Sequence, residues 1–173
     1  GGLICRRGYS EDTVIGSKSK AEELVANAFD VRFRFKTVGD MAEVVKLSVM
    51  KEYPFPVIVG EKFCSEGLIW FRIARNYTFK WYAKVIYIGE YLEGGLSAES
   101  LNLRRESPVY TSLLYSELSK SNIPYIYRIK YNINFWRFAP YIEERFITKW
   151  RKVNTVDSLI GYPISLMLRV FSK

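Results

Sequence analysis

The stretch 115-YSELSKSNIPYIYRIKYNINFWRF-138 decides the predicted fold of this chain. Its first half continues a helix that we expect to begin at Pro108 and to run to about Lys120, because proline suits the first position of a helix. Asn122 and Pro124 end this helix, since proline cannot continue it. The apolar stripe of the helix consists of Leu113, Leu114 and Leu118.

The second half alternates between apolar and polar side chains, which indicates a strand or two short strands. One face of that strand carries the odd positions, Tyr125, Tyr127, Ile129, Tyr131, Ile133 and Phe135. The other face carries Arg128, Lys130, Asn132 and Asn134. We therefore expect a sheet in this half of the chain, packed against the preceding helix.

The remaining pattern extends this interpretation to a two-domain α/β (α+β) protein. We expect helices at 20–28, 41–52, 84–93 and 153–159, and strands at 3–6, 13–15, 31–36, 57–59, 68–73, 77–82 and 164–171. Gly94 and Gly95, with the polar stretch that follows them, mark a boundary. The prediction is a small N-terminal mixed α/β domain at 1–100 and a C-terminal domain at 101–173, whose central mixed sheet is flanked by helices.

Composition favours a polyanionic partner. The 173 residues contain 26 Lys and Arg against 18 Asp and Glu, a net charge of +8, which suits RNA, DNA or anionic lipid without choosing among them. No apolar run reaches the roughly 20 residues that a membrane-spanning helix requires, and the start of the sequence does not read as a signal peptide. We expect no membrane partner and a cytoplasmic location.

The side chains that carry common hydrolytic chemistry are missing. The chain has no histidine, so a serine or cysteine nucleophile has no imidazole base. Cys5 and Cys64 do not form a metal-ligand pattern, although one disulfide between them stays open. The doublet Glu143 and Glu144 is more typical of a solvated loop than of a pair of metal ligands. The sequence has no glycine-rich phosphate-binding motif. We expect no metal and no cofactor.

Cations alternate with aromatic residues at 70–82 and 125–137, and a compact basic cluster follows at 149–152. Such segments can stack on unpaired bases and contact phosphates. They are equally typical of strands with one aromatic and one solvated face. The candidate RNA-binding residues are Arg128, Lys130, Arg137, Lys149, Arg151 and Lys152.

The quoted stretch from Tyr115 to Phe138 resembles the C-terminal nuclease domain of archaeal tRNA-splicing endonucleases. In that family a helix with a tyrosine, acid and leucine precedes a strand with a lysine and a phenylalanine. Similar but shorter likenesses occur at 14–29, 90–96 and 164–171. The family cuts precursor tRNA at bulge-helix-bulge motifs without metal, using a tyrosine, a histidine and a lysine.

The resemblance implies that all three catalytic positions are vacant here. Phe138 stands where the tyrosine belongs, Glu144 lies where the histidine is expected, and Ser158 takes the place of the lysine. Asn122, Arg128, Asn132 and Asn134 also depart from the glycines and aspartate of active subunits. The chain is therefore similar to a non-catalytic structural subunit.

The implied assembly is a heterotetramer (α2β2) with the catalytic subunit of a tRNA-splicing endonuclease, acting on precursor tRNA. The family's last strand pairs across a subunit interface, which makes Ile164, Leu166, Leu168 and Val170 interface candidates, with ordinary core as the favoured alternative. Two other hypotheses stay open. One is a stand-alone basic RNA- or DNA-binding module, and the other is an enzyme of a different kind.

Overall fold

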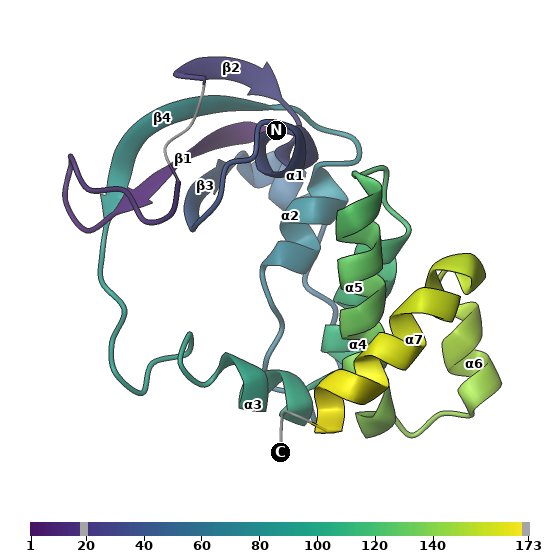
Figure 1. Ribbon diagram of the computed structural model, residues 1–173. Helices are drawn as coiled ribbons and strands as arrows, with labels where there is room; N and C mark the ends of the chain where they lie inside the picture. Colours follow the sequence, from purple (N-terminus) through teal and green to yellow (C-terminus); the bar gives the residue numbers. More distant parts are fainter. Residues whose placement is uncertain (18–20, 171–173) are drawn as a thin grey trace. The chain divides into compact units, whose positions relative to one another are not determined.

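The computed structural model describes residues 1–17 and 21–170, which fold into helices and a four-stranded mixed sheet, so the α/β class is confirmed (Figure 1). The chain divides into two compact units. The first unit contains Gly1–Phe55 and Ile69–Gly95. The second unit contains Pro56–Leu68 and the chain from Leu96 onward. Residues 56–68, which the sequence-based boundary assigned to the N-terminal domain, therefore belong to the second unit.

The sheet of the first unit has the strand order β2-β4-β1-β3. Its strands are β1 (Gly2–Gly8), β2 (Glu23–Ala26), β3 (Met41–Val45) and β4 (Phe79–Ile88). The central pair β1 and β4 is parallel, with Ile4 opposite Trp81. The outer strands are antiparallel to their neighbours, with Leu24 opposite Trp81 and Ala42 opposite Cys5.

Three short helical segments complete the first unit. They are a π-helix (Asp30–Arg34), α1 (Leu47–Glu52) and α2 (Gly67–Ile73), of which the part from Ile69 onward belongs to this unit. The rings of Phe29 and Phe71 stack with their centroids 5.2 Å apart, and Phe33 stacks on both. This aromatic contact joins the π-helix to α2 and explains why Phe33 is buried.

Among the described residues of the second unit, all regular secondary structure is helical. Its helices are α3 (Ser100–Glu106), α4 (Pro108–Ser119), α5 (Tyr125–Phe138), α6 (Phe146–Arg151) and α7 (Thr155–Val170), with a 3-10 turn at Ala139–Tyr141. Helix α5 packs against both α4 and α7 (Figure 1). The core is formed by Phe135, Trp136, Ala139 and Val153, and Tyr115, Trp150 and Tyr162 pack around it.

Several element predictions for the first unit are wrong because strand pairing overrides local preference. Within the helix expected at 20–28, residues 23–26 form strand β2. Within the helix expected at 41–52, residues 41–45 form strand β3, and only Leu47–Glu52 is helical, as α1. Residues 18–20 lie outside the described residues. The expected helix at 84–93 instead extends β4 to Ile88. Conversely, the expected strands at 31–36 and 68–73 are largely helical, as the π-helix and α2.

The central sheet predicted for the C-terminal domain is also wrong. The helix at Pro108–Ser119 is confirmed, but Tyr125–Phe138 forms α5 and not a strand. The expected helix at 153–159 and the expected strand at 164–170 are parts of one helix, α7, while residue 171 lies outside the described residues. On α5 the buried positions include Ile129, Asn132 and Phe135, which recur at helical spacing.

Candidate functional site

Helix α7 turns its small and polar side chains inward. Its buried residues are Asp157, Ser158, Gly161 and Ser165, which are three or four positions apart and share one helix face. This face packs against α5. A helix of a water-soluble domain usually buries its apolar stripe, so α7 has the inverse arrangement.

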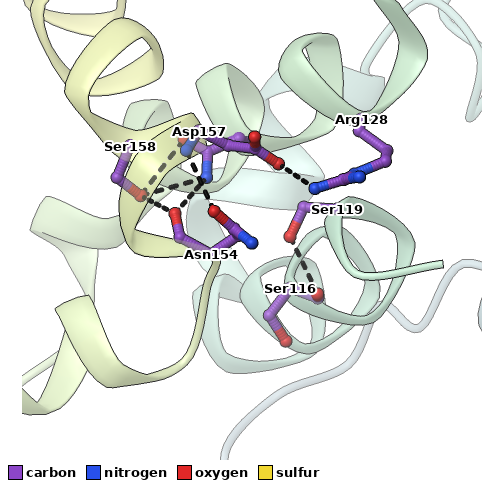
Figure 2. Close-up of polar contacts among 7 residues, drawn as sticks. Ser116, Ser119, Arg128, Asn154, Asp157 and Ser158 are labelled. Atoms are coloured by element: carbon purple, nitrogen blue, oxygen red, sulfur yellow. Dashed lines mark hydrogen bonds and ion pairs between the residues drawn. The ribbon is translucent and has the colours of Figure 1, made fainter. Parts of the chain in front are cut away.

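A hydrogen-bonded cap fixes the start of α7. The side-chain oxygen Oδ1 of Asn154 accepts a hydrogen bond from the backbone N–H of Asp157 at 3.0 Å, which is the usual role of asparagine before a helix. The Asp157 carboxylate in turn accepts a bond from Nη2 of Arg128 at 2.8 Å (Figure 2). Asp157 is 2% exposed and lies in the first turn, where negative charge stabilises a helix.

The Ser158 hydroxyl makes three hydrogen bonds, two of which join α7 to α5. It accepts from Nδ2 of Asn132 and from Nε1 of Trp136, both at 3.0 Å, and donates to the carbonyl oxygen of Asn154 at 2.8 Å. A hydroxyl has one proton and two lone pairs, so its hydrogen-bonding capacity is filled. Ser158 is fully buried, and this geometry suits a structural tie between helices rather than a nucleophile.

Gly161 lets the two helices approach closely. A Cβ atom at this position would lie 2.2 Å from Oδ1 of Asn132 and 3.3 Å from the backbone nitrogen of Ile133. Only glycine fits here without displacing α5. The cap, the hydroxyl tie and this contact together fix the rotation of α7 about its own axis.

The opposite face of α7 is apolar and exposed. We call it the outward stripe, and it consists of Val156, Leu159, Ile160, Met167 and Val170. Between 45% and 71% of each of these residues is exposed. Their spacing of three, one, seven and three positions keeps them on one side of the helix. No charged residue interrupts the sequence from 158 to 168.

Helix α6 borders this stripe through an aromatic cluster. Tyr162 lies 5.5 Å from Phe146 and 6.3 Å from Trp150, measured between ring centroids. Tyr162 follows Leu159 by three positions and precedes Leu166 by four, so these side chains are neighbours on the surface of α7. The contact therefore places α6 along one side of the outward stripe.

The predicted vacant catalytic positions each have separate partners. Phe138 is buried and stacks on Tyr115, with 5.9 Å between the ring centroids. Glu144 forms an ion pair with Lys152 at 2.6 Å. Ser158 belongs to the tie between α5 and α7. The burial of Tyr115 raises the pKa of its phenol, which opposes a role as a proton donor near neutral pH.

The predicted RNA-binding residues do not form the single face that a strand would give them. Arg128 and Lys130 would share a strand face, but on α5 they point about 200° apart. The carboxylates of Asp157 and Glu144 neutralise Arg128 and Lys152. Arg137 lies over the Phe138 ring at 5.9 Å, while Lys149 and Arg151 are in the last turn of α6.

The four interface candidates all lie on α7 and are all exposed. Their assignment to a core, which was the favoured alternative, is therefore wrong for this chain. Val170 belongs to the outward stripe, and Ile164 and Leu166 flank it. Leu168 lies seven positions after Gly161, on the inward side of α7 near its end. The predicted site residues did not include Val156, Leu159, Ile160 and Met167, although their helical spacing was a readable signal.

Other chemistry has little support in the described residues. Within 1–17 and 21–170, no group of three or more cysteine, aspartate or glutamate side chains is placed to hold a metal ion. Over the same ranges, none of the helices is both long enough and apolar enough to cross a membrane. Cys5 and Cys64 are not disulfide-bonded, so the disulfide that was left open does not form.

A comparison with known protein families, with curated proteins and with solved structures finds no match to this chain.

Proposed function

We propose that this chain acts by docking to a larger surface, as a non-catalytic component of an assembly. The observation that carries the proposal is the outward stripe of α7, whose apolar side chains are exposed while polar ones are buried beneath them. A contiguous exposed apolar surface of this kind usually marks an interaction site. The hydrogen bonds beneath α7 prevent the helix from rotating to hide the stripe.

The size of the effect fits docking. Burying one Val, Leu, Ile or Met side chain contributes about 1.5–3 kcal/mol, and the five stripe residues are each roughly half to two-thirds exposed. Covering the stripe would therefore contribute on the order of 5 kcal/mol. This gain is comparable to the low end of the cost of association, about 4 kcal/mol or more, so the partner needs additional contacts.

The identity of the assembly stays a prediction. The sequence resemblance implies the structural subunit of an α2β2 tRNA-splicing endonuclease that acts on precursor tRNA. The exposure of Ile164, Leu166, Leu168 and Val170 is compatible with a subunit interface there. However, the resemblance needs a strand at 125–135, and α5 occupies that segment. The specific assignment therefore rests on the sequence alone.

The stand-alone nucleic-acid-binding module also stays a prediction, and the loss of a common strand face for Arg128 and Lys130 weakens it. A cytoplasmic location belongs to the docking proposal. Cysteines that are not disulfide-bonded are typical of reducing compartments, and neither Cys5 nor Cys64 is in a disulfide.

Nonionic detergent micelles test docking without specifying a partner. The chain should bind micelles, or self-associate in their absence, in sedimentation velocity. The variant Leu159→Gln/Met167→Gln should stay monomeric and free of detergent. The matched control Leu47→Gln/Val57→Gln, which changes exposed apolar residues elsewhere, should behave like the original chain.

Circular dichroism should give the same helix content for all three proteins, because every substituted side chain is exposed. A chain that remains monomeric with and without micelles would refute the proposal. Equal loss of association in the stripe variant and the control would refute it as well, because docking would then not depend on α7.

A further inference from the structure

We infer that the outward stripe and α6 form a surface that docks on an anionic lipid bilayer, with α7 lying in the plane of the interface. This inference rests on the proposed docking function and names its occupant, and it replaces the expectation of no membrane partner, which concerned membrane-spanning segments. It combines three observations on the second unit: an uninterrupted apolar face, cations along its border, and aromatic side chains between the two.

The apolar face has the form of an interfacial helix. Helix α7 has 16 residues and is therefore about 24 Å long, and the outward stripe runs from its first turn to its last. Helices of this kind place their apolar side in the acyl boundary and hold polar groups away from it. Here the polar side faces α5, where Asp157 and Ser158 are satisfied by Arg128 and Asn132. The polar side chains of α7 thus bind α5, whereas those of an isolated amphipathic helix would bind water.

Cations border the stripe on the side where α6 lies. Arg145 precedes α6, and Lys149 and Arg151 are in its last turn. These three side chains have no ion pair among the described residues, in contrast to Lys152, which is held by Glu144. Arg169 lies seven positions after Tyr162, on the same side of α7. Cations beside an apolar face are placed to contact phosphate headgroups when the face enters the acyl region.

The aromatic cluster lies between these two features. Phe146 is about half exposed, and Trp150 and Tyr162 are partly exposed at the seam of α6 and α7. Tryptophan and tyrosine favour the level of the headgroups, where their rings are apolar and their N–H or O–H groups remain hydrated. The order stripe, aromatic seam and cations therefore matches the order of a bilayer from acyl chains to headgroups.

This combination favours lipid over a protein partner. A protein partner would need carboxylates placed at fixed positions opposite Arg145, Lys149 and Arg151. An anionic bilayer supplies mobile negative charge at any spacing. Long cationic side chains can also reach headgroups while their stems cover apolar surface.

Vesicle cosedimentation with the whole 173-residue chain tests the inference. We expect binding to phosphatidylcholine vesicles that contain phosphatidylglycerol, and much weaker binding to phosphatidylcholine alone. The charge variant Lys149→Ala/Arg151→Ala should bind anionic vesicles at least about tenfold more weakly, since each cation near the surface contributes roughly fivefold. The stripe variant Leu159→Gln/Met167→Gln should lose about tenfold or more on both vesicle types.

The matched control for charge is Lys51→Ala/Lys62→Ala, which removes two exposed cations outside α6 and α7 and should bind almost as well as the original chain. Added salt should weaken the anionic preference, because it screens surface charge. Equal binding by the charge variant and the original chain would overturn the inference.

The outcomes separate the inference from the proposed function. Stripe-dependent binding to detergent micelles with no preference for anionic vesicles would overturn the lipid assignment and leave docking in place. The same holds for a stoichiometric complex with a catalytic splicing-endonuclease subunit that depends on Leu159 and Met167 and occurs without vesicle binding. Loss of both micelle and vesicle binding would overturn both.

Discussion

Substitution of Gly161 by alanine tests the packing that holds α7 in its inverse orientation. The added Cβ would lie 2.2 Å from Oδ1 of Asn132, which is far inside van der Waals contact. Asn132 cannot easily move away, because it is fully buried and its amide donates to Ser158 at 3.0 Å. Either α5 and α7 must separate, or the tie between them must break.

The expected cost follows from three terms. Overpacking costs about 1–3 kcal/mol, and weakening a buried hydrogen bond adds about 1 kcal/mol. Alanine recovers up to about 1 kcal/mol because it favours a helix more than glycine does. We therefore expect Gly161→Ala to lower the free energy of unfolding of the second unit by about 2 kcal/mol. Since 1.4 kcal/mol is a factor of ten, amide exchange in α5 and α7 should accelerate about thirtyfold.

Hydrogen exchange with mass spectrometry is the suitable assay, because it reports peptides of α5 and α7 separately from the first unit. The control is a double-mutant cycle with Asn132→Ala, which removes the atoms that the new Cβ would strike. In that background Gly161→Ala should be neutral or stabilising by up to about 1 kcal/mol. A neutral Gly161→Ala in the original chain, or an equal cost in both backgrounds, would refute the close-packing argument.

Three further predictions concern Asp157, the two cysteines and Phe138. Asp157→Asn should lower the free energy of unfolding of the second unit by about 1–3 kcal/mol, measured by urea unfolding. The reason is that Arg128 loses its ion-pair partner and α7 loses a favourable negative charge in its first turn. The control Thr155→Ala, which changes an exposed neighbour, should have little effect. Iodoacetamide should alkylate Cys64 well before Cys5 in the native protein at mildly alkaline pH. The reason is that burial covers the Cys5 thiol and also raises its pKa. Equal alkylation rates of the two cysteines in peptide mass spectra would contradict this. Phe138→Tyr should lower the melting temperature, because it adds a buried hydroxyl against Tyr115, and it should not produce cleavage of a bulge-helix-bulge RNA by the chain.

The sequence predicted the elements whose signals are local. Pro108 and the leucines that follow it were sufficient to place α4, because helix starts and apolar stripes are encoded within a few turns. Residues 3–6, which were predicted as a short strand before a polar turn, likewise lie in β1. In contrast, 41–45 has helix-favouring residues and still joins the sheet as β3, because β1 offers it hydrogen-bonding partners far away in sequence.

The segment 125–138 shows why a period can be misread. Its apolar and polar residues alternate as in a strand, but a strand of eleven residues would be unusually long. Where the sequence fits both the two-residue period of a strand and the 3.6-residue period of a helix, such a length favours the helix. The buried helical set was hidden because one of its members is Asn132, which looks like a surface residue until Ser158 and Gly161 are seen beside it. The misread period also produced the false common face for Arg128 and Lys130.

In helix α7 as well, the apolar pattern alone was not sufficient to predict which residues are buried. The run from Ile164 to Val170 is apolar except for Ser165 and Arg169. Such a run predicts that its apolar side chains are buried, but it does not predict that this chain buries them. The deciding information lies in the polar residues between them. The Asp157 carboxylate and the Ser158 hydroxyl bind side chains of α5, so both face inward, and the helical period then places Leu159 and Met167 outward. The exposed stripe is thus a consequence of satisfied buried hydrogen bonds, and the free energy that remains in its exposed apolar surface is available to a docking partner.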